Sequence, residues 1–295
     1  MRVFVTGAAG FIGRAVIPEL INNGHTVLGL VRSDASAETI TKLGAEVHRG
    51  DLEDIESLKS GAAASDGVIH LAFVHDFANM AKSSAIDRAA ITAMADHLEG
   101  KPLVITNGTM SCPKGVLATE DTEGETVGPA ADRVKAEALV KELTKTKGIR
   151  GSVVRLTPTV HGLEDKGFIK IVAGLSQKAG AAIYINDGSS RWSAVHRLDA
   201  AVLYRLALEK GQPGAIYHAV AEEGVPTKDI VTLIGKKTGL PVEGKTMEEA
   251  TPLLGFFAHA LAADNPASSE KTRKELGWTP TQITLLKDIE ENYFK

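Results

Sequence analysis

Three glycine residues near the N-terminus, Gly7, Gly10 and Gly13, have the spacing of a turn that binds the phosphates of a dinucleotide. They stand between an apolar strand predicted over residues 2–6 and an amphipathic helix predicted over 11–23. Gly7 permits a sharp turn, Gly10 lets the backbone approach a pyrophosphate, and Gly13 lets the helix pack closely on the sheet. The free N–H groups and the dipole at the start of the helix favour the phosphate charge. The alternative is an ordinary strand–helix turn. The cofactor contacts predicted here are Gly7, Ala9, Gly10, Phe11 and Ile12.

The end of the second predicted strand, residues 26–31, distinguishes NAD from NADP. An acidic residue at this place binds the ribose 2′-hydroxyl, whereas an arginine accommodates a 2′-phosphate. This strand is followed by Arg32, Ser33 and Asp34. Arg32 can pair with a phosphate and Ser33 can donate a hydrogen bond to it, which favours NADP(H). Asp34 comes late enough to cap the next helix instead, and Arg32 could also be a solvated charge.

Two further segments fit the same site. A third strand ends close to Asp51, whose carboxylate could reach the adenine amino group or could cap the helix near residues 55–59. A fourth strand, predicted over 67–72, ends at Ala72, which is small enough for a cofactor ribose to pass. The predicted cofactor contacts in these segments are Asp51, Leu52, Leu71, Ala72 and Phe73.

Strands and helices alternate along the first half of the chain, which predicts a parallel sheet with helices on both faces. The fold class is therefore α/β, a Rossmann-type doubly wound parallel sheet with a smaller, mostly helical C-terminal substrate lobe. Residues 1–160 form the predicted NADP-binding domain, to which 190–220 return, and 161–295 form the interleaved substrate lobe. The predicted strands are 2–6, 26–31, 45–48, 67–72, 102–106, 150–156 and 215–219, and the main predicted helices are 11–23, 35–43, 79–99, 130–146, 167–178, 200–209 and 226–238.

The composition excludes several classes of protein. Apolar residues make up 43% of the 295 residues and the formal net charge is −4, which disfavours nucleic acid and anionic membranes as partners. No apolar run is long enough to span a bilayer, and the N-terminus lacks a signal-peptide pattern. The single cysteine, Cys112, excludes an intrachain disulfide, and the nine histidines do not have metal-ligand spacing. We therefore expect a cytoplasmic protein with no metal site.

Several motifs together resemble those of the short-chain dehydrogenase/reductase superfamily in its extended form. They are the glycine turn, Gly50-Asp51-Leu52, His70-Leu71-Ala72, and the stretch from Ser268 to Pro280 that is similar to the closing motif of sugar-nucleotide epimerase relatives. The stretches 67–77 and 191–199 resemble an atypical subgroup with poorly kept active-site residues. The resemblance covers nearly the whole chain and implies a nicotinamide dinucleotide as cofactor.

The resemblance also implies a tyrosine and a lysine four residues apart on one helix, where the lysine holds the nicotinamide ribose and the tyrosine exchanges a proton with the substrate. No tyrosine occurs before Tyr184. Lys135 follows Ala131 by four residues, so Lys135 is the predicted ribose ligand and an alanine takes the tyrosine position. Arg133 with Glu137 could occupy the same two positions instead.

Other site residues are implied by the same resemblance. Thr109 is the predicted hydroxyl that faces the substrate, and Asp87 falls where extended relatives carry an asparagine, although it could be a solvated helix charge. The segment from Arg155 to Gly162 resembles one that lines the nicotinamide side. The remaining predicted cofactor contacts are Thr106, Asn107, Leu156, Pro158 and Val160.

Three histidines could supply the missing proton, because histidine titrates near neutral pH. His75 follows the fourth strand, and His161 and His196 lie in segments that resemble substrate-facing parts of the family. Arg191 and Trp192 could bind a flat, polar or anionic group, although Trp192 could equally be a core residue. We therefore place His75 among the catalytic candidates and His161, Arg191, Trp192 and His196 among the substrate contacts.

These residues favour an enzyme that uses NADPH to reduce small carbonyl compounds, with aldehydes as the first expected class and ketones as the second, because hydride transfer needs mainly positioning. Two alternatives stay open: a sugar-nucleotide epimerase or dehydratase, which the missing tyrosine disfavours, and an NADP(H)-binding sensor without chemistry. The protein is expected to be a monomer or a homodimer, since extended relatives often pair through the helices that correspond to 79–99 and 130–146.

Overall fold

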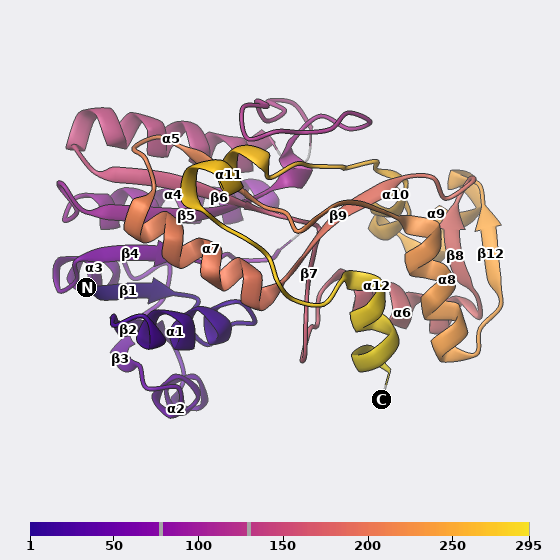
Figure 1. Ribbon diagram of the computed structural model, residues 1–295, viewed down its shortest axis with the longest axis horizontal. Coiled ribbons are helices and arrows are strands. Elements are labelled where there is room, and N and C mark those ends of the chain that lie inside the picture. The colour runs from indigo at the N-terminus through magenta and orange to yellow at the C-terminus, as the bar shows by residue number, and fades with distance from the viewer. Residues whose placement is uncertain (77–78, 129–130, 295) are drawn as a thin grey trace.

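The computed structural model describes residues 1–76, 79–128 and 131–294, and it forms a larger and a smaller lobe (Figure 1). The larger lobe is built on a seven-stranded sheet with the order β10-β6-β5-β4-β1-β2-β3. Every neighbouring pair of strands in it is parallel. Its strands are β1 (Arg2–Thr6), β2 (Thr26–Val31), β3 (Glu46–Arg49), β4 (Gly67–His70), β5 (Pro102–Gly108), β6 (Arg150–Leu156) and β10 (Ile216–Ala219).

Helices cover both faces of this sheet. Because side chains alternate along a strand, Val3 and Val5 of β1 join one hydrophobic core while Phe4 joins the other. Helices α1 (Gly13–Asn22), α2 (Asp34–Lys42) and α7 (Arg197–Lys210) cover the first face, and α3 (Ile55–Ala63), α4 (Met80–Ala95) and α5 (Ala131–Lys147) cover the second. The predicted Rossmann-type doubly wound α/β fold is confirmed.

The smaller lobe has its own hydrophobic core around Trp192, Ile230 and Leu261. Its helices are α6 (Phe168–Ala179), α8 (Thr227–Thr238), α9 (Met247–Leu254), α10 (Phe256–Ala262) and α12 (Leu285–Asp288), followed by a π-helical turn at Ile289–Tyr293. They pack around the two parallel strands β8 (Ala182–Ile185) and β12 (Val242–Lys245).

A third, three-stranded sheet in the order β11-β9-β7 lies between the lobes (Figure 1). It consists of β7 (Thr159–His161), β9 (Arg191–His196) and β11 (Glu222–Pro226). After β9 the chain returns to the larger lobe through α7 and β10, and α11 (Glu270–Leu276) also packs there. The two lobes are thus connected by several crossings of the chain.

Most predicted elements occur, with shifted ends. The helix predicted over 79–99 ends at Ala95, and the predicted start of the next helix, residue 130, lies outside the described residues. Strands β7, β9, β11 and β12 were not predicted as strands. In the part of the chain that the structure describes, no helix is both long and apolar enough to cross a membrane.

Candidate functional site

The glycine turn lies where the strand order reverses, between β1 and β4. In open α/β sheets, ligands bind at this place, outside the carboxyl ends of the strands, and β1 points from the N-terminus toward the smaller lobe (Figure 1). Gly7 has φ +67°, and a Cβ on it would lie 2.8 Å from the backbone nitrogen of Ala72. Gly7 and Ala72 therefore touch, as expected if both line one cofactor site.

The start of α1 has the shape that a dinucleotide requires. A Cβ on Gly13 would overlap the carbonyl oxygens of Gly7 and Ala8, so only glycine lets the helix begin this close to the turn. The first N–H groups of a helix have no acceptor within it and can bind phosphate oxygens. The residues present thus fit a dinucleotide at this turn, and phosphate binding by Ala9 to Ile12 stays a prediction.

The adjacent ends of β2 and β3 each carry an arginine. Arg32 is exposed just beyond the strand, and the sheet register sets its neighbour Val31 opposite Arg49 on β3. Arg49 also pairs with the exposed carboxylate of Asp34. Sequence reasoning missed Arg49, because only the pairing of β2 with β3 brings it here.

Two helix caps differ from the capping alternatives that the sequence left open for Asp34 and Asp51. Ser33, not Asp34, caps α2, and its hydroxyl oxygen accepts a hydrogen bond from the backbone of Ser36 at 3.2 Å. Similarly, Asp54 rather than Asp51 caps α3. Asp51 accepts hydrogen bonds from the backbone nitrogens of residues 53 and 54, which forms a tight turn after β3 beside Leu52.

A chain of buried polar groups runs from the glycine turn into the larger lobe. His70, at the end of β4, lies with Nδ1 2.7 Å from the Thr6 hydroxyl and Nε2 3.2 Å from Oδ1 of Asp87. Thr6 in turn accepts a hydrogen bond from the nitrogen of Ala72. Asp87 is only 3% exposed, so it is not the solvated helix charge that the sequence left open.

Arg133 on α5 continues this chain to the strand ends. One guanidinium nitrogen donates to Asp87 at 3.2 Å, another donates to the carbonyl oxygen of Thr106 at 2.7 Å, and the guanidinium stacks 3.9 Å from the centre of the Phe73 ring. Burial lowers the pKa of Arg133, and the negative charge of Asp87 opposes that effect. The site therefore contains a held cation that joins α4, β5 and the loop after β4.

His75 lies beside this cation. Its ring centroid is 5.3 Å from that of Phe73, on which Arg133 stacks. Partial burial and the charge of Arg133 lower the pKa of His75 below its usual value. The structure thus brings the predicted residues His75, Asp87 and Phe73 together.

Lys135 takes a different direction from Arg133. Its side chain is 61% exposed and its ammonium group donates to Asp132 at 2.6 Å, one turn earlier on α5. Arg133 is therefore the α5 cation that reaches Asp87 and Phe73, while ribose binding by Lys135 stays a prediction that these contacts do not support.

Thr109 is fully buried at the start of a 3-10 turn, Thr109–Ser111. Its hydroxyl donates to the side-chain oxygen of Asn265 at 2.9 Å, and the amide of Asn265 donates back to the carbonyl of Thr109. This reciprocal pair joins the loop after β5 to the segment before α11. The structure thus shows a buried structural contact where the sequence predicts a substrate-facing hydroxyl.

Thr106 and Asn107 anchor the end of β5. Thr106 donates to the carbonyl of His70, and the buried Tyr204 donates to the Thr106 hydroxyl at 2.7 Å. Asn107 donates to Glu137, which forms a two-point ion pair with the fully buried Arg155 at 2.7 and 2.9 Å. Both predicted cofactor residues therefore have structural partners beneath the strand ends.

The predicted residues after β6 lie along the boundary between the lobes. Leu156 ends β6 opposite Gly108, Pro158 follows it, and Val160 lies within β7. His161 bonds to Asp288 at 2.8 Å, and its ring packs edge to face on that of His196. Burial and the neighbouring His161 lower the pKa of His196, whose Nδ1 caps α7.

Arg191 and Trp192 have partners inside the smaller lobe. Trp192 is fully buried and its indole nitrogen donates to the carbonyl of Ala260 at 3.0 Å, which is the core role that the sequence left open. Arg191 forms a two-point pair with Asp264. The Arg191 side chain is 45% exposed beside this pair, so its contact with a substrate stays a prediction.

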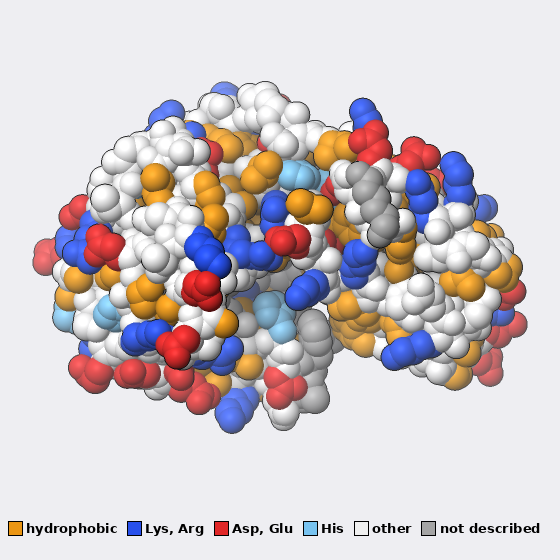
Figure 2. Space-filling view, turned by 90° about the horizontal axis from the view of Figure 1, so that it is seen from below, with side chains coloured by type: hydrophobic (Ala, Val, Ile, Leu, Met, Phe, Trp, Pro, Cys, Tyr) orange, Lys and Arg blue, Asp and Glu red, His pale blue; other side chains and the backbone are white. Residues whose placement is uncertain are grey.

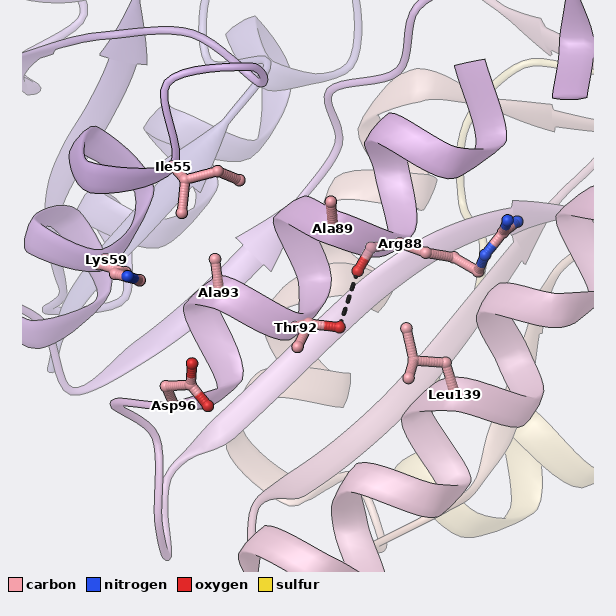
Figure 3. A pocket seen from close by; sticks show the side chains of 8 residues that line it. All are labelled: Ile55, Lys59, Arg88, Ala89, Thr92, Ala93, Asp96 and Leu139. Carbon is pink, nitrogen blue, oxygen red and sulfur yellow. Dashed lines mark hydrogen bonds between the residues drawn. The ribbon is translucent and has the colours of Figure 1, made fainter. Parts of the chain in front are cut away.

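A depression separates the lobes on the face in Figure 2, where lysine or arginine and histidine side chains lie along it. A second depression lies on the outside of the larger lobe between α3, α4 and α5 (Figure 3). It is lined by Ile55, Lys59, Arg88, Ala89, Thr92, Ala93, Asp96 and Leu139. None of these lining residues belongs to the predicted site. Pairing of two copies of the chain through α4 and α5 stays a prediction.

The fold and the glycine turn define a dinucleotide-binding protein of the Rossmann class. Residues 3–220 match the model of the NAD dependent epimerase/dehydratase family, and the chain belongs to this family.

Known relatives differ in activity. An uncharacterized protein of Saccharomyces cerevisiae is 46% identical over 99% of both chains. A ketoreductase of Stigmatella aurantiaca that acts on 4-hydroxy-2-methyl-3-oxo-4-farnesyl-3,4-dihydroquinoline-1-oxide is 25% identical over 94% of this chain and 92% of its own. The dTDP-glucose 4,6-dehydratase DesIV of Streptomyces venezuelae, solved with NAD, has a similar fold, with a TM-score of 0.79 at 18% identity over 99% of this chain and 95% of its own.

Proposed function

We propose that the protein is an NADPH-dependent oxidoreductase that reduces small carbonyl compounds, aldehydes first and ketones second. The bound cofactor supplies the hydride. Residues 9–12 would hold its phosphates, Arg32 and Arg49 its 2′-phosphate, and Ala72 would leave room for a ribose. The ketoreductase relative supports reduction of a carbonyl group over sugar-nucleotide chemistry.

The observation that carries this proposal is the position of Arg133. Its guanidinium is held by Asp87 on α4 and by the carbonyl of Thr106 near the carboxyl end of β5. Asp87 also contacts His70, which bonds to Thr6 immediately before the glycine turn. Two of its five N–H groups are used in these bonds, and a fixed cation can stabilise the negative charge that develops on a carbonyl oxygen during reduction. Arg133 would thus polarise the substrate where the resemblance implies a tyrosine.

His75 is the residue that we propose for proton exchange. It packs on the same Phe73 ring as Arg133, so both could contact one substrate oxygen. Burial and the charge of Arg133 lower its pKa, so the fraction of His75 that is protonated, which alone can donate the proton that the reduced oxygen takes up, should fall as the pH rises. Asp87 then acts through Arg133, as a positioning residue that keeps the guanidinium at the strand ends.

A sensor without chemistry is the second candidate. The absence of tyrosine before residue 184 favours it. It predicts that the protein binds NADPH but that no carbonyl compound accelerates the oxidation of that cofactor.

The first experiment mixes the purified protein with NADPH and a panel of small aldehydes and ketones, and follows the absorbance of the reduced nicotinamide. We expect oxidation that depends on the aldehyde and saturates with its concentration. NADPH binding without oxidation across the panel would contradict the reductase and support the sensor.

Arg32→Ala is expected to weaken NADPH binding by about tenfold or more, because a charge-assisted hydrogen bond to the 2′-phosphate is worth roughly 1.5–3 kcal/mol. NADH binding should change little, since NADH lacks that phosphate. Fluorescence titration of both cofactors measures the two affinities. Arg2→Ala is the matched control, because Arg2 begins β1 at the opposite end of the sheet. Equal losses for both cofactors would refute the assignment.

A further inference from the structure

Three charged side chains from separate parts of the chain meet beside the glycine turn. Arg14 lies in the first turn of α1, Glu164 in the loop between β7 and α6, and Arg197 at the start of α7. A guanidinium nitrogen of Arg14 donates to the Glu164 carboxylate at 2.7 Å, and Nη1 of Arg197 lies 3.9 Å from the same carboxylate oxygen. One carboxylate thus faces two cations.

Arg197 has binding capacity that this cluster does not use. Its guanidinium lies 5.1 Å from the centre of the ring of Phe11, a residue of the glycine turn. Its Nη1 is buried and has no hydrogen-bond partner among the described residues. Burial, followed by the charge of Arg14, lowers the pKa of Arg197, and Glu164 is the first of the carboxylates that oppose this effect.

Two further carboxylates act on Arg197 electrostatically but are engaged elsewhere. Asp165 accepts hydrogen bonds from Tyr293 and from the backbone of Gly167. Asp288 accepts hydrogen bonds from Asn292 and bonds to His161. Glu164 is therefore the carboxylate that lies directly between the two arginines.

The Glu164 side chain can be displaced from the two arginines. Its side chain is 54% exposed, and its backbone has φ +68°, a left-handed conformation that a glutamate adopts only at a cost. A backbone turn, in which the nitrogen of Asp165 donates to the carbonyl of Gly162, holds this conformation. The ion pair with Arg14 positions the Glu164 side chain alone, so an anion that binds the arginines more strongly would displace that side chain.

We propose that Arg14 and Arg197 form an anion subsite for the phosphate groups of the dinucleotide, and that Glu164 occupies it in the free protein and is displaced on binding. Phosphate oxygens match the planar fork of arginine better than a single carboxylate oxygen does, and they carry more charge. The proposal rests on the dinucleotide binding in the proposed function and not on carbonyl reduction.

Glu164→Gln tests the displacement. Because the substitution removes the competing negative charge, we expect NADPH and inorganic pyrophosphate to bind about three- to tenfold more tightly, and adenosine to bind unchanged. Isothermal titration calorimetry measures the three affinities. Glu243→Gln is the matched control, since Glu243 forms a partly exposed ion pair with Lys245 in the smaller lobe.

Arg197→Met is the second test of the anion subsite. We expect it to weaken pyrophosphate and NADPH binding, and we expect Glu164→Gln to give no gain when added to it. Unchanged or weaker pyrophosphate binding by Glu164→Gln alone would overturn the displacement. Failure of the native protein to bind NADPH would refute the proposed function, while the pyrophosphate measurements would still decide on the subsite.

Discussion

Arg133→Met is expected to reduce the turnover of aldehydes by about a hundredfold or more while NADPH still binds. Removal of one preorganised donor to a developing oxyanion typically costs this much. The methionine keeps part of the apolar stem but lacks the guanidinium that stacks on Phe73, and it cannot donate to a substrate oxygen. Steady-state kinetics gives the turnover, and fluorescence titration gives the NADPH affinity.

A second readout does not depend on turnover. The pKa of His75 is lowered by burial and by the charge of Arg133, so loss of that charge should raise it. Titration of the imidazole by NMR in Arg133→Met and in the native protein measures the difference. Lys141→Met, an exposed change on the same helix, should leave both the turnover and the pKa unaltered.

Two further variants separate Arg133 from the alternatives. Arg133→Lys should recover part of the turnover, because it restores the charge without the planar fork. Lys135→Met tests the ligand that the sequence predicts. If Lys135→Met abolishes turnover and Arg133→Met does not, the role assigned to Arg133 is wrong and Lys135 is the functional cation of α5.

The sequence could not determine which cation of α5 faces the sheet. Residues two apart on a helix point in nearly opposite directions, so Arg133 and Lys135 cannot both face the sheet. With no tyrosine to set the alignment, spacing alone could not choose between them. The structure shows that Arg133 faces the sheet. Glu137, one turn further along the same helix face, points inward and pairs with the buried Arg155. This is the alternative in which Arg133 and Glu137, rather than Ala131 and Lys135, occupy the positions of the family's tyrosine and lysine.

Local patterns predicted the glycine turn well because its chemistry is encoded in adjacent residues. The short strands β7, β9 and β11 were missed because their pairing joins segments far apart in the chain. For the same reason the cluster of Arg14, Glu164 and Arg197 could not be predicted. Trp192 was ambiguous for a different reason, since an aromatic side chain suits both a core and a binding site.

The ion pair between Glu137 and Arg155 is expected to be the most sensitive point of the larger lobe. Both side chains are almost completely buried, and Arg155 also donates to the carbonyl of Thr122 and the sulfur of Cys112. Removing one partner leaves the other charge buried and uncompensated, so Arg155→Met should lower the free energy of unfolding by about 3–5 kcal/mol. Urea unfolding followed by circular dichroism measures this loss.

The double variant Glu137→Leu with Arg155→Met separates the ion pair from the packing around it. It leaves neither charge buried, so it should cost less than the sum of the two single changes. Glu38→Gln, which breaks an exposed pair with Lys42 on α2, should have little effect. Additive losses in the double variant would contradict a coupled pair. A coupled pair would mean that Glu137 anchors the face of α5 from which Arg133 reaches the strand ends, so that weakening it should also lower turnover.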